Sequence, residues 1–217
     1  MAHPMLIIFD VDGTLLQSQR ATVPAIREVF QAQGLTPPSE AAIRQTVGLP
    51  VHEFEAWLAR RCPPQTAPDI VEAVNERELE FIATAGALFP GVLPALQALT
   101  RAGHALATCT NASVPYLTQV LQEFSLRKFF QLNTCIGQGY PDKTAMVRHI
   151  MGTIQLRPAI VVGDRATDIE AAKANGAYAI AARYGYGTDA EFHHADAHAR
   201  VAADIVDIVA RLGDMPH

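Results

Sequence analysis

Short apolar runs alternate along most of the chain with segments whose apolar residues recur at helical spacing. The candidate strands are residues 5–9, 105–109, 133–136, 159–162 and 177–181. Their apolar residues are continuous rather than alternating, which is typical of strands covered by helices on both faces of a sheet. The candidate helices between them are residues 92–102, 113–123, 142–151 and 167–174. This order predicts an α/β fold with a parallel sheet.

The stretch from residue 20 to residue 86 does not follow this alternation. It has helical patterns and no good strand, with breaks at Pro and Gly residues. The predicted helices are residues 22–33, 39–46, 51–61 and 68–84. Thr22 is a plausible N-cap of the first, and Gly34 can end it.

This stretch is far longer than an ordinary connection between a strand and a helix. We therefore predict an inserted helical subdomain. The predicted division is an α/β core of residues 1–16 and 87–217 and a helical cap of residues 17–86.

Composition and charge exclude several classes of function. Hydrophobic residues make up 49% of the 217 residues, enough for a well-buried core. The net charge is −5 and no Lys/Arg run occurs, which argues against nucleic-acid binding. The N-terminal apolar run is too short for a signal peptide or a membrane span, so we expect a cytoplasmic protein. A monomer and a homodimer both fit the sequence.

The three cysteines point to the same compartment. Cys62, Cys109 and Cys135 form neither a CxxC pair nor a disulfide framework. We expect three reduced thiols, as in cytoplasmic proteins.

Polar residues follow four of the predicted strands or open the next helix. They are Asp10 and Asp12 in Phe-Asp-Val-Asp-Gly-Thr-Leu, the pair Thr110-Asn111, Lys143, and Asp164 and Asp168 in Gly-Asp-Arg-Ala-Thr-Asp. Ligands of open α/β sheets bind at the carboxyl ends of the strands. Each element alone also fits a turn, a helix cap or a solvated charge. Their occurrence together, in order, favours one functional site.

The chemistry of these residues indicates a phosphoryl site with a hard metal ion. Four carboxylates in one place would raise each other's pKa values, and a divalent cation and a Lys would relieve the repulsion. Oxygen ligands without His or Cys suit Mg²⁺ and do not suit zinc. The Thr110 hydroxyl, the Lys143 ammonium and loop amides can hold phosphoryl oxygens.

FDVDGTL, TN, Lys143 and VVGDRATD, in this order, resemble the haloacid dehalogenase superfamily. The resemblance runs over nearly the whole chain and implies a Rossmann-like core. The helical insert is similar to the caps of phosphoglycolate phosphatase-like and β-phosphoglucomutase-like members.

The resemblance implies a Mg²⁺-dependent phosphatase that acts on a small phosphorylated metabolite through an aspartyl-phosphate. It assigns Asp10 as the nucleophile and Asp12 as the general acid/base. The implied phosphate ligands are Thr110, Asn111 and Lys143, and the implied metal ligands are Asp10, Asp12 and Asp164. Asp168 takes the supporting acidic position.

The cap loop around residues 48–52 is expected to select the substrate, with Arg44 and His52 as its candidate polar groups. Val51 stands where mutase-like relatives tend to carry an Arg that holds a second phosphate. Gln17-Ser18 replaces the Asp-Ser pair of many phosphoglycolate phosphatase-like members. These departures disfavour a mutase and leave the substrate open.

Three alternatives to a phosphatase remain. A phosphomutase keeps Asp12 and is the nearest. A haloacid dehalogenase generally lacks this second Asp, and a non-catalytic phosphate-binding module would have lost Asp10, Lys143 or Asp164. His193, His194 and His198 form a His-rich tract, for which we predict a solvated loop rather than a metal site.

Overall fold

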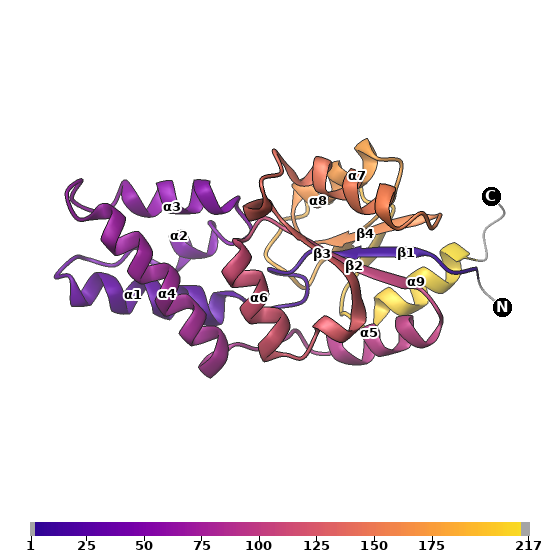
Figure 1. Cartoon of the computed structure of the whole chain (residues 1–217), viewed down its shortest axis with the longest axis horizontal. Helices are drawn as coiled ribbons and strands as arrows, with labels where there is room; N and C mark the ends of the chain where they lie inside the picture. The colour runs from indigo at the N-terminus through magenta and orange to yellow at the C-terminus, as the bar shows by residue number, and fades with distance from the viewer. Residues whose placement is uncertain (1–2, 214–217) are drawn as a thin grey trace.

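A parallel six-stranded sheet forms the centre of the protein, in the order β3-β2-β1-β4-β5-β6. The computed structural model describes residues 3–213. The strands are β1 (Leu6–Phe9), β2 (Ala105–Thr110), β3 (Phe130–Cys135), β4 (Ala159–Gly163), β5 (Tyr178–Ala182) and β6 (Ala197–Ala199). Strand β1 pairs with β2 on one side and β4 on the other, so it is central (Figure 1). The predicted α/β fold with a parallel sheet is confirmed.

Helices cover both faces of the sheet, which explains why β1, β2, β4 and β5 are buried along nearly their whole length. The strand predicted at residues 133–136 is β3 at Phe130–Cys135, in which Gln131 is exposed. Ile7 and Phe9 pack into one core, with α5 (Val92–Arg101), α6 (Val114–Glu123) and α9 (Asp204–Gly213). Leu6 and Ile8 pack into the other, with α7 (Lys143–Thr153) and α8 (Ala166–Ala174). Two short 3₁₀ helices, η1 (Arg127–Phe129) and η2 (Ile136–Gln138), flank β3.

Four helices follow β1 and form what we call the helical unit: α1 (Gln19–Ala32), α2 (Glu40–Arg44), α3 (Val51–Ala59) and α4 (Ala67–Ala85). They share a separate apolar core that includes Phe30, Ile43, Leu58 and Val74. The helical unit lies beyond the end of the sheet toward which β1 runs (Figure 1). The carboxyl ends of the central strands therefore face it.

The structure corrects the predicted start of the first helix. Helix α1 begins at Gln19, and Thr22 lies buried inside it rather than at its N-cap. The Thr22 hydroxyl lies 3.1 Å from the carbonyl oxygen of Ser18 and also contacts Glu78. A hydroxyl that bonds backward within a helix cannot cap its start, so the predicted cap is wrong.

Two elements near the C-terminus were not predicted. Strand β6 lies in the His-rich tract and has only three residues, of which His198 is exposed. His193 and His194 lie in an exposed turn, as expected for a solvated loop. Helix α9 buries Ile205, Ile208 and Val209, whose spacing is helical.

The cysteines agree with the prediction from the sequence, since all three are free thiols. Cys109 and Cys135 are buried and Cys62 is partly buried. Within residues 3–213, no helix has the length and apolar character needed to cross a membrane.

Candidate active site

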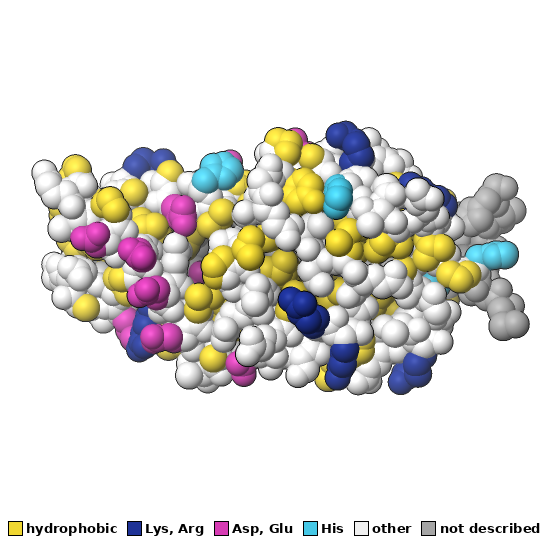
Figure 2. All heavy atoms as spheres, in the orientation of Figure 1, with side chains coloured by type: hydrophobic (Ala, Val, Ile, Leu, Met, Phe, Trp, Pro, Cys, Tyr) yellow, Lys and Arg dark blue, Asp and Glu magenta, His cyan; other side chains and the backbone are white. Residues whose placement is uncertain are grey.

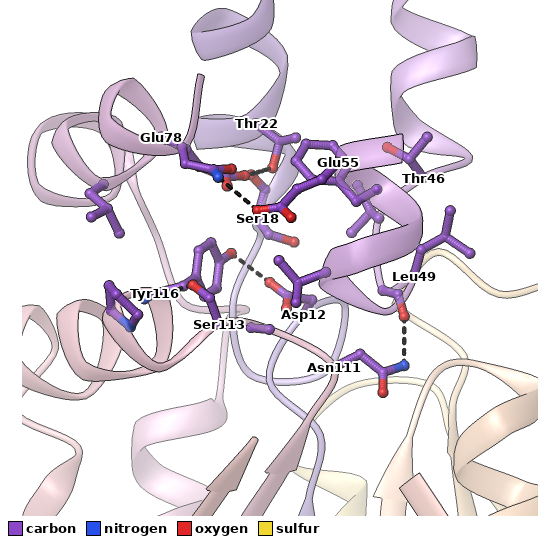
Figure 3. Close-up of a pocket in the computed structure, with 18 of the residues that line it drawn as sticks. Asp12, Ser18, Thr22, Thr46, Leu49, Glu55, Glu78, Asn111, Ser113 and Tyr116 are labelled. Atoms are coloured by element: carbon purple, nitrogen blue, oxygen red, sulfur yellow. Dashed lines mark hydrogen bonds between the residues drawn. The ribbon is translucent and has the colours of Figure 1, made fainter. Parts of the chain in front are cut away.

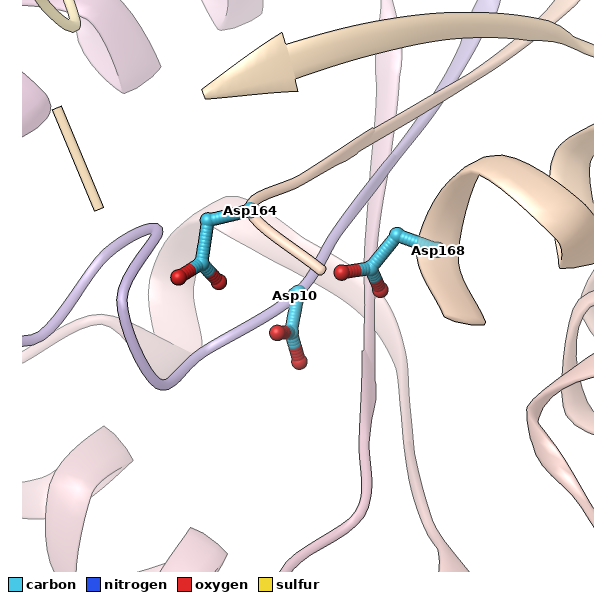
Figure 4. Close-up of side chains that lie close together, drawn as sticks. All are labelled: Asp10, Asp164 and Asp168. Carbon is cyan, nitrogen blue, oxygen red and sulfur yellow. The ribbon is translucent and has the colours of Figure 1, made fainter. Parts of the chain in front are cut away.

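Three carboxylates come together at the carboxyl edge of the sheet. Asp10 follows β1, Asp164 follows the neighbouring strand β4, and Asp168 lies in the first turn of α8. One oxygen of each lies within 4.8 Å of the others, and all three side chains are buried (Figure 4). The pairing of β1 with β4 thus brings together residues more than 150 positions apart in the sequence.

Lys143 supplies the positive charge beside this cluster. Its Nζ atom lies 2.9 Å from Asp10 Oδ1 and 2.7 Å from Asp168 Oδ1, and all three side chains are almost fully buried. Asp142 caps α7 by accepting a hydrogen bond from the Ala145 amide, which fixes where this helix begins. Burial lowers the pKa of Lys143, but the Asp10 and Asp168 carboxylates outweigh it and raise that pKa above its usual value. Lys143 is therefore a permanent cation.

The carboxylates carry more negative charge than Lys143 offsets. Burial and the neighbouring Asp168 raise the pKa of Asp10 well above its usual value, although Lys143 lowers it. Burial and Asp168 also raise the pKa of Asp164 to about 7, against the hydrogen bond from the Tyr186 amide. Asp10 Oδ2 is buried and has no hydrogen-bond partner among residues 3–213. An all-oxygen group with an unpartnered buried oxygen fits a hard divalent cation such as Mg²⁺.

Gly13 allows the loop after β1 to pass close to Asp164. Its φ is +77°, in the left-handed region that favours glycine. A Cβ atom there would stand 2.1 Å from Asp164 Oδ2, which is far inside van der Waals contact. The positive φ and the close approach to Asp164 therefore explain why the Asp-Val-Asp-Gly motif ends in glycine.

The Asp12 carboxylate is not one of the three clustered carboxylates. It accepts a hydrogen bond of 2.6 Å from the Tyr116 hydroxyl (Figure 3). It also lies 3.5 Å from Thr110 Oγ1. Burial raises the pKa of Asp12, and the Tyr116 hydrogen bond opposes that shift. The structure therefore does not group the Asp12 carboxylate with the predicted metal ligands Asp10 and Asp164, because the chain turns between residues 10 and 12.

A cavity of about 380 Å³ lies between the helical unit and the sheet-bearing core. Asp12, Asn111 and Tyr116 line it from the core, and residues of α3, α4 and the loop before α3 line it from the helical unit (Figure 3). Asp12 thus stands between the buried cluster and a cavity large enough for a small organic group.

Asn111 holds the helical unit against the core. Its side-chain amide donates a hydrogen bond of 3.0 Å to the carbonyl oxygen of Gly48, and its own backbone carbonyl accepts one of 3.0 Å from the Val51 amide. Its neighbour Thr110 lies beside Asp12. The amide of Asn111, a predicted phosphate ligand, is therefore engaged with the helical unit in this structure.

The two predicted specificity residues do not line the cavity. Arg44 lies on the solvent side of α2 and forms an exposed salt bridge of 2.6 Å with Glu40. His52 is exposed on α3. Ile43, the neighbour of Arg44, packs into the core of the helical unit, and Val51, the neighbour of His52, lines the cavity. Consecutive residues of a helix point in different directions, so Arg44 and His52 point outward.

Sequence reasoning missed most of the polar residues of the cavity, among them Ser18, Glu78 and Tyr116. The sequence indicated that Glu78 is buried, because it lies on the apolar face of α4, four residues from both Val74 and Ile82. Tyr116 follows Ser113, whose hydroxyl caps α6, and nothing in its spacing marks it as a partner of Asp12.

Glu78 predicts a pH-dependent stability. Burial raises its pKa to about 7 from the usual 4.5, while the Thr22 hydroxyl opposes the shift. The native state thus favours the protonated form. We expect Glu78 to contribute its full stabilisation below pH 4.5. As the pH rises through 7, the free energy of unfolding should fall by about 3 kcal/mol. Urea unfolding at pH 4.5 and 8 should show a fall in the free energy of unfolding that is smaller by about 3 kcal/mol in Glu78→Gln than in wild type. The remaining fall comes from Asp10, Asp12 and Asp164, whose pKa values are also raised.

Glu80→Gln is the matched control, because Glu80 is exposed on the same helix. This variant should keep the pH dependence of the wild type. Equal pH slopes in wild type and Glu78→Gln would contradict the assignment to Glu78.

The fold and this acidic site define a class of hydrolase, and comparison with known proteins gives the family. The family model described as "Haloacid dehalogenase-like hydrolase" matches residues 7–182. The chain therefore belongs to the haloacid dehalogenase-like hydrolases. The predicted resemblance and the prediction of an enzyme are confirmed.

Individual relatives carry two kinds of name. The phosphoglycolate phosphatase of Vibrio cholerae is 30% identical, over 83% of this chain and 85% of that protein. The tyrosine-protein kinase PtkA of Mycobacterium tuberculosis is also 30% identical over 85% of this chain, which spans only 64% of PtkA. A crystal structure of a predicted phosphoglycolate phosphatase from Haemophilus somnus superposes with a TM-score of 0.85, covering 96% of this chain and 99% of that one, at 24% identity. This last likeness shows the fold.

Proposed function

We propose that this protein is a Mg²⁺-dependent phosphatase that hydrolyses a small phosphorylated metabolite through an aspartyl-phosphate on Asp10. The observation that carries the proposal is the placement of Asp10, with one oxygen paired to Lys143 and the other buried without a partner. An anionic nucleophile held beside a permanent cation suits attack on a phosphoryl group. The phosphatases among the relatives support this choice.

Asp10, Asp164 and Asp168 are the residues that would hold Mg²⁺. A bound Mg²⁺ supplies positive charge that offsets these carboxylates and the phosphoryl oxygens. Lys143 contributes a second positive charge from the protein itself. Together these charges allow two anions, the carboxylate of Asp10 and the phosphate ester, to approach one another.

The chain's own residues then divide the reaction into two steps. An Asp10 oxygen attacks phosphorus while the bond from phosphorus to the ester oxygen breaks, and Asp12 gives that oxygen a proton. A water molecule next attacks the aspartyl-phosphate and loses a proton to Asp12, which releases inorganic phosphate and restores Asp10. The raised pKa of Asp12 suits it to carry this proton, and its position on the cavity wall places the leaving alcohol in the cavity.

The composition of the cavity wall argues against the two competing transferases. A mutase must hold a second phosphate, and a kinase must hold a nucleoside triphosphate. Among the described residues, the wall of the cavity contains no Lys, Arg or His. The phosphatase therefore fits better than a mutase or than the kinase activity in the name of PtkA.

The decisive experiment measures phosphate release from an aryl phosphate and from a panel of phosphorylated metabolites. Activity should require added Mg²⁺ and disappear with excess chelator. With a hexose 1-phosphate and a trace of the bisphosphate, the product should be inorganic phosphate. Rapid formation of the 6-phosphate would instead identify a mutase, and full activity in chelator would contradict the metal requirement.

Replacement of Asp12 should have an effect that depends on the leaving group. Asn cannot deliver a proton to the ester oxygen, so Asp12→Asn should lower kcat by about 10²–10⁴ for alkyl phosphates. An aryl phosphate with an acidic phenol needs less protonation, so its loss should be smaller. Rates for a series of phenols and alcohols would show a steeper dependence on leaving-group pKa in Asp12→Asn. An equal loss for all esters would contradict the role of Asp12 as acid.

A further inference from the structure

The cavity above Asp12 has walls of two kinds. Apolar side chains, including Phe54, Leu79 and Pro115, contribute to its lining. The second kind of wall consists of acidic side chains. They are Asp12 from the core, Glu55 from α3, and Glu72, Glu76 and Glu78 from α4. A leaving group that fills this cavity must suit both kinds of wall.

In the described part of the chain these carboxylates have no directly paired cation, although Lys143 is close enough to lower the pKa of Asp12. Among residues 3–213, none of the five takes part in a salt bridge. Glu55 accepts a hydrogen bond of 2.9 Å from the Asn75 amide, and Glu78 contacts the Thr22 hydroxyl, so both partners are neutral. Glu72 and Glu76 are exposed, and Figure 2 shows acidic side chains gathered over the helical unit.

The basic groups near the cavity are engaged with other acids. Arg165 donates a hydrogen bond of 3.3 Å to the carbonyl oxygen of Val47, a cavity residue, but its guanidinium pairs with Glu191. Arg77 lies on α4 next to Glu76 and pairs with Glu28 and Glu80. The electrostatic potential of the cavity is therefore negative, and it opposes a second anionic group on the substrate.

A buried polar group in the cavity wall is also left without a partner. The side chain of Ser18 is almost fully buried and lines the cavity. Its hydroxyl oxygen is near Asp12 and Tyr186 and opposes the rise of both pKa values, but it has no hydrogen-bond partner of normal geometry among residues 3–213. Buried hydroxyls are normally paired, so Ser18 has a hydrogen bond available for a ligand.

We propose that the preferred substrate is the phosphate monoester of an amino alcohol, whose ammonium group binds among Glu55, Glu72 and Glu76 while its carbon chain lies against Phe54 and Leu79. The proposal rests on the phosphatase function above. Hydrolysis breaks the bond between phosphorus and the ester oxygen, adds water, and yields the free amino alcohol and inorganic phosphate. The same charges disfavour phosphoglycolate, which carries a carboxylate where the cavity is acidic.

The test compares kcat/KM for esters that differ in the charge of the leaving group. The panel contains aminoalkyl phosphates of two to six carbons, phosphocholine, uncharged alkyl phosphates of the same lengths, and phosphoglycolate. We expect at least one cationic ester to exceed the matched uncharged ester by about tenfold, since one carboxylate at close range supplies such a factor. Phosphoglycolate should be the poorest. Turnover of phosphoglycolate equal to or above that of ethyl phosphate would overturn the proposal.

Variants locate the preference in the cavity. Glu55→Gln combined with Glu72→Gln and Glu76→Gln should lower the ratio of cationic to uncharged ester by about tenfold or more. Glu53→Gln is the matched control, because Glu53 is exposed on α3 and does not line the cavity. It should leave the ratio unchanged. Glu72→Gln alone, at an exposed position, provides the same test if the triple variant is unstable.

Two kinds of failure remain distinguishable. An aryl phosphate that is not hydrolysed at all would refute the phosphatase itself. An aryl phosphate that is hydrolysed, with no preference for cationic esters or with a preference that survives the triple substitution, would refute only the amino-alcohol assignment.

Discussion

Asp10→Asn should abolish phosphate release while leaving the protein folded. Asn has nearly the same size as Asp but lacks the anionic oxygen that attacks phosphorus. Removal of an essential nucleophile lowers kcat on the order of 10⁶-fold in a well-studied hydrolase. Because Asp10 is buried beside Asp164 and Asp168, loss of its charge also relieves repulsion. The metal-free variant should therefore unfold at a urea concentration no lower than wild type.

The same variant separates catalysis from metal binding. Mg²⁺ should raise the melting temperature of wild type more than that of Asp10→Asn, since one carboxylate of the site is gone. Asp207→Asn removes a charge from the exposed side of α9 and should retain full activity. Turnover by Asp10→Asn near the wild-type rate would overturn the assignment of the nucleophile.

Lys143→Met should cost both stability and activity. It removes the only cation that pairs with Asp10 and Asp168 in the described part of the chain and leaves two buried carboxylates unpaired. Breaking a buried ion pair from one side costs about 3–5 kcal/mol. For a protein of this length, the melting temperature should fall by about 10 °C. Phosphate release should fall by at least about 10²-fold, because the variant loses the buried positive charge beside Asp10.

Lys173→Met provides the matched control, because Lys173 pairs with Asp196 at the surface. An exposed pair contributes at most about 1 kcal/mol, so this variant should melt within a few degrees of wild type. The stability deficit of Lys143→Met should shrink at acidic pH, where the unpaired carboxylates take up protons. An equal fall in melting temperature for Lys143→Met and Lys173→Met would show that Lys143 does not stabilise the protein through its buried ion pairs.

The sheet and the carboxylate cluster were predictable from sequence for a common reason. Strands β1, β4 and β5 are nearly uninterrupted apolar runs, and Asp10 and Asp164 directly follow β1 and β4. Since parallel strands place their carboxyl ends at one edge, position in the sequence was enough to bring these side chains together. Strand β3 contains Gln131 and Asn133, so the apolar pattern located only its last residues. Strand β6 escaped prediction because three residues at a sheet edge carry too little pattern, whereas the stripe of Ile205, Ile208 and Val209 in α9 was visible but not recognised.

The residues that line the cavity could not be predicted from local sequence patterns. The position of Asp12 on the cavity wall depends on how the chain turns after β1, and whether Glu55 reaches the cavity depends on how the helical unit docks. The packing of α4 against α1 within the helical unit places the buried Glu78 beside Thr22. Helical spacing placed Glu78 on an apolar face, but only the packed structure shows which side chains surround it.

The attachment made by Asn111 has a consequence for the order of events in turnover. Thr110 contacts Asp12, and the next residue holds the loop of the helical unit through Gly48 and Val51. Moving that loop aside to admit a substrate must break two hydrogen bonds to the residue that adjoins Thr110. The position of the loop and the position of the Thr110 backbone are therefore coupled, because any movement of the loop would also release the residue next to Thr110.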